Sequence, residues 1–222
     1  MEQRELQHTN AIYIDVEMTC WAGPPPVGMN QEIIEIGAVA MDLTSLEITQ
    51  EQSYFVRPRQ WEISQKCTAL TGITKEDIQS ASSFEDVLTE FIKTFDPKSK
   101  LCGTWGDDAD RIQQACQARG LKSPLRYLVD VGHLFQRAFL LKQQVSLQRA
   151  VTLLGLKFNG APHSALGDAR NTALVHSDII RRIRQAPERQ IIPATESDDV
   201  SGKSEFAKKL VDSLAGLRKI AL

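Results

Sequence analysis

This chain has few cysteines, no excess of positive charge and no long apolar run, and each of these features argues against a class of protein. The four cysteines are scattered, with no Cys-x-x-Cys pair and no closely spaced histidine; they are Cys20, Cys67, Cys102 and Cys116. Such spacing argues against a zinc site and a disulfide framework, and it fits a reducing compartment. The net charge of −2 and the pI near 6.1 argue against a protein that coats long nucleic acid, but not against one that grips a few nucleotides through metal ions.

The sequence also lacks the marks of a membrane or exported protein. No apolar run reaches the ~18 residues that a membrane helix needs, and residues 1–10 are polar. With 222 residues, 42% of them hydrophobic, the chain can bury one good-sized core, alone or with an appendage. We therefore expect a cytoplasmic protein that does not bind membranes.

Two acids at the end of the first apolar stretch form the first candidate site. Residues 11–14 favour a strand, and Asp15 and Glu17 follow with one residue between them. Side chains two residues apart on a strand share a face, so the two carboxylates are expected to lie side by side. Neighbouring acids on a buried strand repel each other and lose hydration, and a divalent cation resolves both conflicts. A pair of solvated acids at a fraying strand end is the alternative.

The remaining pattern predicts an α/β fold with a five-stranded mixed sheet flanked by helices. Residues 32–41 and a segment ending at 54–56 continue the first strand as an antiparallel meander, because their connections are short. Residues 100–105 and 126–131 enclose a helix, which predicts parallel pairing. One helix is expected from Ser64 to a stop and turn at 70–74, a second begins after the cap Ser83, and a third ends at Arg119. Two more are expected over 132–142 and 146–155. The last runs from Ala165 to Arg184, with an apolar stripe that reaches Ile183.

A change of composition divides the chain near residue 186. Pro, Glu, Ser and Asp dominate residues 187–202, which predicts a linker. Residues 203–219 are predicted to form an amphipathic helix with an apolar side made of Phe206, Leu210, Leu214 and Leu217. We expect residues 1–186 to form one domain. The helix in 187–222 is expected to dock on that domain or on a second copy in a homodimer, rather than to act as a nucleic-acid arm.

A histidine and an acid near the start of the last helix form the second candidate site. Asp168 lies about 70° from the centre of the helix's apolar stripe at ~100° per residue, so it is expected to face the sheet edge. His163 lies five residues earlier, in a segment that Asn159-Gly160 and Pro162 predict to be a loop. A loop histidine beside an acid at a helix start can lie over a metal centre, whereas a lone surface histidine has no such role.

Three acids after residues 100–105 form the third candidate site. Asp107, Asp108 and Asp110 could simply cap the helix that follows. That helix is expected to bury Ile112 and Cys116, and projecting backwards places Asp108 on the same face and Asp110 roughly opposite. Asp108 is therefore the predicted inward-facing acid, and Asp110 is the alternative.

Taken together, these motifs resemble the DEDDh family of 3′→5′ exonucleases, whose fold is ribonuclease H-like. The resemblance covers roughly residues 10 to 186 and rests on the order of several short motifs. They are Asp15-x-Glu17, Glu32-Ile33-Ile34-Glu35-Ile36-Gly37, Phe55-Val56-Arg57-Pro58, Leu70-Thr71-Gly72-Ile73-Thr74, and His163 with Asp168. Within the family, the chain is most similar to the branch of histone-mRNA and small-RNA exonucleases. This similarity rests on the stretch from Asp15 to Trp21, the proline-rich loop that follows, and Trp105-Gly106. One motif departs from that branch, because one residue rather than two separates Trp105-Gly106 from Asp108 and no aromatic precedes this acid.

The resemblance implies phosphodiester hydrolysis at two divalent ions that lie ~3.5–4 Å apart. It implies that Asp15 bridges the ions, that Glu17 and Asp168 complete the first, and that Asp108 (or Asp110) holds the second. Oxygen ligands favour Mg²⁺ or Mn²⁺. His163 is implied as the general base, since a histidine titrates near neutral pH. The implied products are nucleoside 5′-monophosphates, released one at a time from a 3′ end.

The terminal nucleotide is expected to bind in a pocket made by Met18, Thr19, Leu70 and Trp105. Leu70 offers an apolar wedge and Trp105 an aromatic face for a base, as in proteins that bind single strands. Both residues could instead be ordinary core residues. Single-stranded RNA is the expected substrate, in preference to DNA. A proofreading or repair deoxyribonuclease and a catalytically silent nucleic-acid-binding module are the alternatives.

Overall fold

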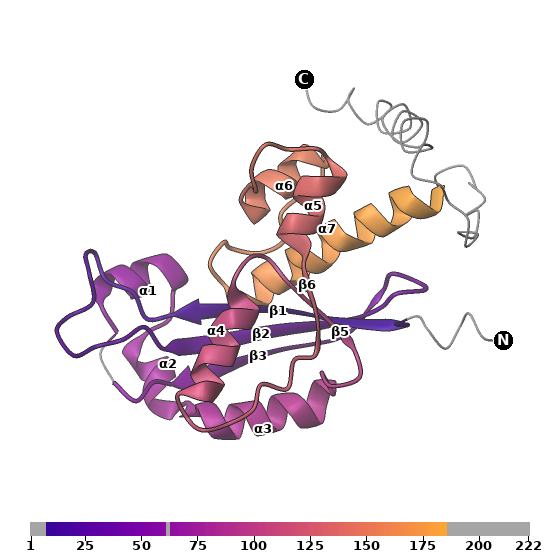
Figure 1. The fold of residues 1–222 in the computed structure, drawn as a ribbon. Coiled ribbons are helices and arrows are strands. Elements are labelled where there is room, and N and C mark those ends of the chain that lie inside the picture. Colours follow the sequence, from indigo (N-terminus) through magenta and orange to yellow (C-terminus); the bar gives the residue numbers. More distant parts are fainter. Residues whose placement is uncertain (1–7, 61–62, 186–222) are drawn as a thin grey trace, which may run out of the picture.

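In the computed structural model, which describes residues 8–60 and 63–185, helices cover both faces of a six-stranded mixed sheet (Figure 1). The strands are β1 (Asn10–Met18), β2 (Ile33–Asp42), β3 (Ile48–Arg57), β4 (Ser82–Ser83), β5 (Leu101–Thr104) and β6 (Tyr127–Asp130). The helices are α1 (Gln65–Thr71), α2 (Lys75–Ser80), α3 (Phe84–Phe95), α4 (Asp108–Gln117), α5 (Val131–Ala138), α6 (Leu147–Leu153) and α7 (Ala165–Gln185). The strand order β4-β3-β2-β1-β5-β6 places β1 near the centre.

The strand directions confirm the expected α/β fold with a mixed sheet. β1, β2 and β3 pair antiparallel, and β5 and β6 extend the sheet from β1 in parallel. The expected count of five strands is wrong, because β4 adds a sixth. Ser82 and Ser83 pair in parallel with Val56 and Arg57 of β3. A strand of two residues shows no alternation of polar and apolar side chains, so the sequence pattern does not predict it.

The two faces of β1 belong to different hydrophobic clusters. Ile12, Ile14 and Val16 pack with residues of α3 and α4. Ala11 and Tyr13 point to the opposite face and pack with α5, α6 and α7. Because side chains alternate along a strand, the acids that follow at positions 15 and 17 face α7. β2 is buried from Ile33 to Met41, since helices cover both of its faces.

The helix ends follow the expected capping chemistry at several places. Ser64 accepts a hydrogen bond from the Cys67 amide at the start of α1, and Gly72 ends that helix with a φ of 77°. Ser83 caps α3 in the same way. The turn expected after Gly72 contains a further short helix, α2, which begins with a capping box between Thr74 and Asp77.

The prediction that Ile183 belongs to the buried apolar stripe of α7 is wrong. Ile183 is 67% exposed, because the C-terminal end of α7 leads away from the sheet (Figure 1). The predicted linker and amphipathic helix over 187–222 lie outside the described residues, so these predictions and the division at residue 186 stay untested. Within the described part of the chain, no helix combines the length and the apolar character that crossing a membrane requires.

Candidate active site

Asp15 and Glu17 lie side by side on β1, on the face of the sheet that α7 covers. Glu17 is 8% exposed, and its neighbour across the strand pair is Glu35 of β2. Burial raises the pKa of Glu17 to about 8, and the carboxylates of Asp168, Glu35 and Asp108 add to the rise. The expected pair is therefore not a pair of solvated acids. It is a buried and mutually repelling cluster.

The start of α7 brings the second candidate pair to the same place. His163 is in the loop before the helix with a φ of 61°, and its amide donates a hydrogen bond to Asp168 Oδ2 at 3.2 Å. One ligand atom each from Glu17, His163 and Asp168 lie within 4.8 Å of one another. Burial raises the pKa of the Asp168 carboxyl, although the amide and side chain of His163 oppose the rise.

Asp108 joins this cluster, whereas Asp110 does not. Burial raises the pKa of Asp15 well above its usual range, and among the neighbouring carboxylates Asp108 contributes most, before Asp168. The pKa of Asp108 is itself raised to about 7, first by burial. Asp110 is exposed, on the other side of the first turn of α4. Asp108, the predicted acid, is therefore near enough to Asp15 for the two carboxylates to repel each other.

Helix capping does not account for these acids. Asp107 is at the N-cap position of α4, but its side chain makes no capping hydrogen bond. Its carboxylate instead pairs with Arg111 at 2.8 Å. Asp108 is left to face the strand that carries Asp15.

The cluster has the composition of a divalent cation site. Four carboxylates contribute oxygen ligands of the kind that Mg²⁺ and Mn²⁺ prefer, and a histidine lies at the rim. Asp168 Oδ1 is buried and has no hydrogen-bond partner among the described residues. A buried carboxylate oxygen without a donor is costly unless a cation occupies the space beside it. These donors therefore fit a bound divalent ion.

Glu35 is a fifth acid at the site, and the sequence interpretation assigned it no role. It is 5% exposed, and its carboxylate accepts hydrogen bonds from Ser53 Oγ at 2.6 Å and from the Ala165 amide at 3.1 Å. Glu35 thus ties the first residue of α7 to the sheet, three residues before Asp168. Its position as a lone acid in the buried run of residues 33–41 is the signal that could have identified it.

Gly37, two residues further along β2, allows α7 to approach. A Cβ atom at this position would lie 2.1 Å from the Ala165 carbonyl carbon and 2.2 Å from the Leu166 amide nitrogen. Only glycine leaves room for this backbone contact. Glu35 and Gly37 therefore set the height of the α7 start, and with it the place of Asp168, above β1.

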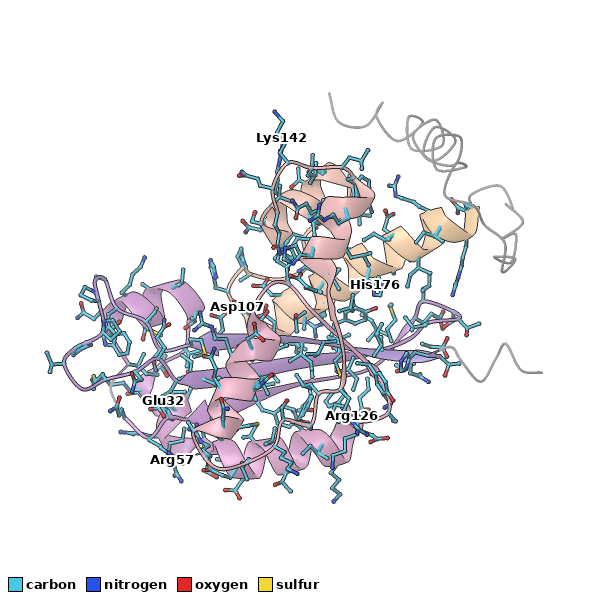
Figure 2. All side chains as sticks on the ribbon, in the orientation of Figure 1. Glu32, Arg57, Asp107, Arg126, Lys142 and His176 are labelled. Atoms are coloured by element: carbon cyan, nitrogen blue, oxygen red, sulfur yellow. The ribbon has the colours of Figure 1, made fainter. Side chains whose placement is uncertain are left out.

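Beneath the acids, Tyr13 and His176 form a buried polar pair between β1 and α7. The Tyr13 hydroxyl lies 2.6 Å from His176 Nδ1, and Figure 2 shows His176 on α7. Burial lowers the pKa of His176 to about 4 and raises the pKa of Tyr13. Both side chains are therefore neutral at pH 7.

The four residues predicted to bind the terminal nucleotide come from the end of β1, from α1 and from the position after β5. Met18 is its last residue, and Leu70 on α1 is 37% exposed. Thr19 is buried, and its amide, hydroxyl and carbonyl oxygen all bond residues 31–32. Trp105 packs against the cluster that includes Phe135, and its indole donates to the Val145 carbonyl at 3.2 Å. Their role in binding stays a prediction.

The fold is that of a solved nuclease domain. The nuclease domain of 3′hExo, a DEDDh family member, bound to rAMP, matches with a TM-score of 0.73 and 26% sequence identity. The match covers 80% of this chain and 94% of that one. The expected ribonuclease H-like exonuclease fold is confirmed.

The sequence comparisons give the family. The RNase_T family, described as exonuclease, matches residues 12–176, and the chain belongs to this family. It is 32% identical over 189 residues to ERI1 exoribonuclease 2 of Danio rerio, covering 74% of this chain and 34% of the relative. It is 31% identical over 191 residues to 3′-5′ exoribonuclease 1 of Rattus norvegicus, covering 77% and 55%. The chain thus matches only about a third to a half of the length of these curated relatives.

Proposed function

We propose that this chain is a divalent-metal-dependent 3′→5′ exonuclease that acts on single-stranded RNA. The observation that carries the proposal is the meeting of Asp15, Glu17, Asp108 and Asp168 with His163 at one end of β1. The relatives named above are exoribonucleases, and the structural neighbour holds rAMP, which supports RNA as the substrate. We place this activity in the domain predicted over residues 1–186.

Asp15, Glu17, Asp108 and Asp168 would hold two divalent ions, Mg²⁺ or Mn²⁺. When bound, such ions activate a water molecule and neutralise the charge that develops on the phosphate and on the leaving oxygen. The surrounding residues hold these carboxylates in place. Glu35 and Gly37 fix α7, so Asp168 is held opposite the acids of β1.

His163 acts as the general base in this proposal. It accepts a proton from the attacking water, whose oxygen forms the new bond to phosphorus. The bond between phosphorus and the 3′ oxygen of the preceding nucleotide breaks, and that oxygen takes up a proton to become a new 3′ hydroxyl. The released product is a nucleoside 5′-monophosphate. The position of His163 in an exposed loop, close to Glu17 and Asp168, supports this role.

The terminal nucleotide binds among Met18, Thr19, Leu70 and Trp105 in this proposal. The exposed part of Leu70 and the ring of Trp105 supply apolar surface against a base. Because stacking tolerates every base, we expect weak sequence preference. Thr19 contributes by holding the end of β1 against residues 31–32, since its polar groups are already bonded there.

Release of mononucleotides from end-labelled RNA and DNA of one sequence tests the proposal. With Mg²⁺ we expect 5′-monophosphates from the 3′ end, faster from RNA, and loss of hydrolysis in Asp15→Ala and in EDTA. Faster digestion of DNA would instead indicate a deoxyribonuclease. Tight oligonucleotide binding without metal-dependent hydrolysis would indicate a silent binding module. Hydrolysis by Asp15→Ala at the wild-type rate would contradict the mechanism.

A further inference from the structure

A cavity of about 590 Å³ adjoins the end of β1 on the α4 face of the sheet. Its walls come from Met18, the loop containing Pro25, residues 30–33 at the entry to β2, Arg59-Gln60, and the side of α4. We call this cavity the α4 groove. The proposed mechanism makes no use of it beyond Met18.

Three arginines line the α4 groove: Arg59, Arg111 on α4, and Arg119 just after the end of that helix. Arg119 is built into the wall, since its side chain is 8% exposed. Its guanidinium lies 3.4 Å from Glu32, 3.5 Å from Glu85 and 4.6 Å from the Phe84 ring centroid. Its Nε has no hydrogen-bond acceptor among the described residues. Figure 2 labels its partner Glu32, the residue just before β2.

The other two guanidiniums are accessible. Arg111 is 36% exposed and pairs with Asp107, which is 64% exposed. Arg59 is 57% exposed and pairs with Glu85. Exposed ion pairs contribute little stability, ~0–1 kcal/mol, so a phosphate can replace the carboxylate at little cost. Arginine is well suited to that exchange, because its planar fork binds two phosphate oxygens at once.

Besides Glu32, which pairs with Arg119, carboxamides supply the remaining polar surface of the groove, from Asn30, Gln31, Gln60 and Gln114. Gln60 and Gln31 are bonded to neighbouring backbone. In the part of the chain that the structure describes, the side chains of Asn30 and Gln114 make no hydrogen bond. Free amides both donate and accept, as the edges of nucleobases require. Met18 and Pro25 add apolar surface beside them.

The groove begins close to the active site, on the other side of the end of β1. Met18 lines it and directly follows Glu17. On α4, Asp108 is in the first turn, and Arg111 and Gln114 follow at intervals of three on one side of the helix. At ~1.5 Å per residue, Gln114 lies roughly 9 Å along α4 from the acid. A strand whose last phosphodiester lies at the acids can therefore pass around the end of β1 and continue into the groove.

We propose that the α4 groove binds the nucleotides upstream of the scissile bond, with Arg111 and Arg59 on phosphates and Gln114 and Asn30 on a base. This inference rests on the proposed exonuclease function. It adds a second subsite, for upstream nucleotides, to the pocket proposed for the terminal nucleotide.

Two substrates test it: an eight-nucleotide oligouridylate, and the p-nitrophenyl ester of uridine 5′-monophosphate, which has no upstream nucleotide. In Arg111→Ala and in Gln114→Ala, the ratio of kcat/KM for the oligonucleotide to that for the ester falls about tenfold, as expected for one lost contact of ~1.4 kcal/mol. Arg149→Ala removes an exposed arginine from α6, on the opposite face of the sheet, and leaves the ratio unchanged.

An unchanged ratio in both groove variants would overturn the inference while leaving the exonuclease function intact. Failure of the wild-type protein to hydrolyse either substrate with Mg²⁺ would instead overturn the proposed function. In that event the anisotropy of the fluorescein-labelled oligouridylate still decides the inference, because weaker binding by the two groove variants than by Arg149→Ala supports it. Equal binding by all three contradicts it.

Discussion

Replacing Gly37 by alanine is expected to damage both stability and activity, because the start of α7 lies directly on this residue. The new Cβ would lie 2.1 Å from the Ala165 carbonyl carbon, whereas ordinary contacts begin at 3.4 Å. The helix start must therefore withdraw by about 1.3 Å, and backbone on both sides makes the adjustment difficult. Overpacking of this kind costs about 1–3 kcal/mol of unfolding free energy. A shift of ~1 Å in Asp168 can lower the rate about 100-fold.

Urea unfolding and hydrolysis of end-labelled RNA measure the two effects separately. Gly23→Ala is the matched control, since nothing lies within 4 Å of a Cβ at that position. We expect the control to stay within ~0.5 kcal/mol of wild type. Wild-type stability in Gly37→Ala would refute the close packing of α7 on β2. A fall in stability with an unchanged rate for the folded protein would refute the link between the helix start and Asp168.

Three further predictions follow from the contacts around the site. Glu35→Gln should lower the rate of RNA hydrolysis while changing the unfolding free energy little, because it weakens the hydrogen bond to the Ala165 amide. Ser45→Ala, at a distant turn, is the control for both measurements. In EDTA the unfolding free energy should fall as the pH rises from about 4.5 to about 8, since folded Glu17 keeps a proton that the unfolded chain releases. Urea titrations should show a smaller fall in Glu17→Gln and with Mg²⁺, and equal falls would contradict the raised pKa. Tyr13→Phe should lower the unfolding free energy by about 1–3 kcal/mol, because the buried His176 nitrogen loses its partner, whereas exposed Tyr127→Phe should not.

Local chemistry explains which parts of the fold were predictable from sequence. The apolar run of β2 and the capping serines of α1 and α3 each depend on neighbours within a few residues. β4 has only two residues and depends on pairing with β3, which is distant in sequence. α2 was interpreted as a turn, because six residues show too little of a helical period.

The acid cluster was partly predictable for the same reason. The spacing of Asp15 and Glu17 places both on one strand face, and the offset of Asp168 from the α7 stripe directs it to the sheet edge. The projection that favours Asp108 over Asp110 agrees with the position of Asp108 beside Asp15. Glu35 was missed because its partners, Ser53 and Ala165, are 18 and 130 residues away. The α4 groove depends likewise on distant segments.

Comparing Asp108→Asn with Asp110→Asn shows whether the acid cluster is the catalytic site, since the two acids share the first turn of α4 and only Asp108 faces Asp15. The measurement is the rate at which each variant releases 5′-monophosphates from a 3′-end-labelled RNA with Mg²⁺. We expect the rate to fall by at least ~100-fold in Asp108→Asn and to stay within about twofold of wild type in Asp110→Asn. The reverse order, or equal rates for the two variants, would contradict it.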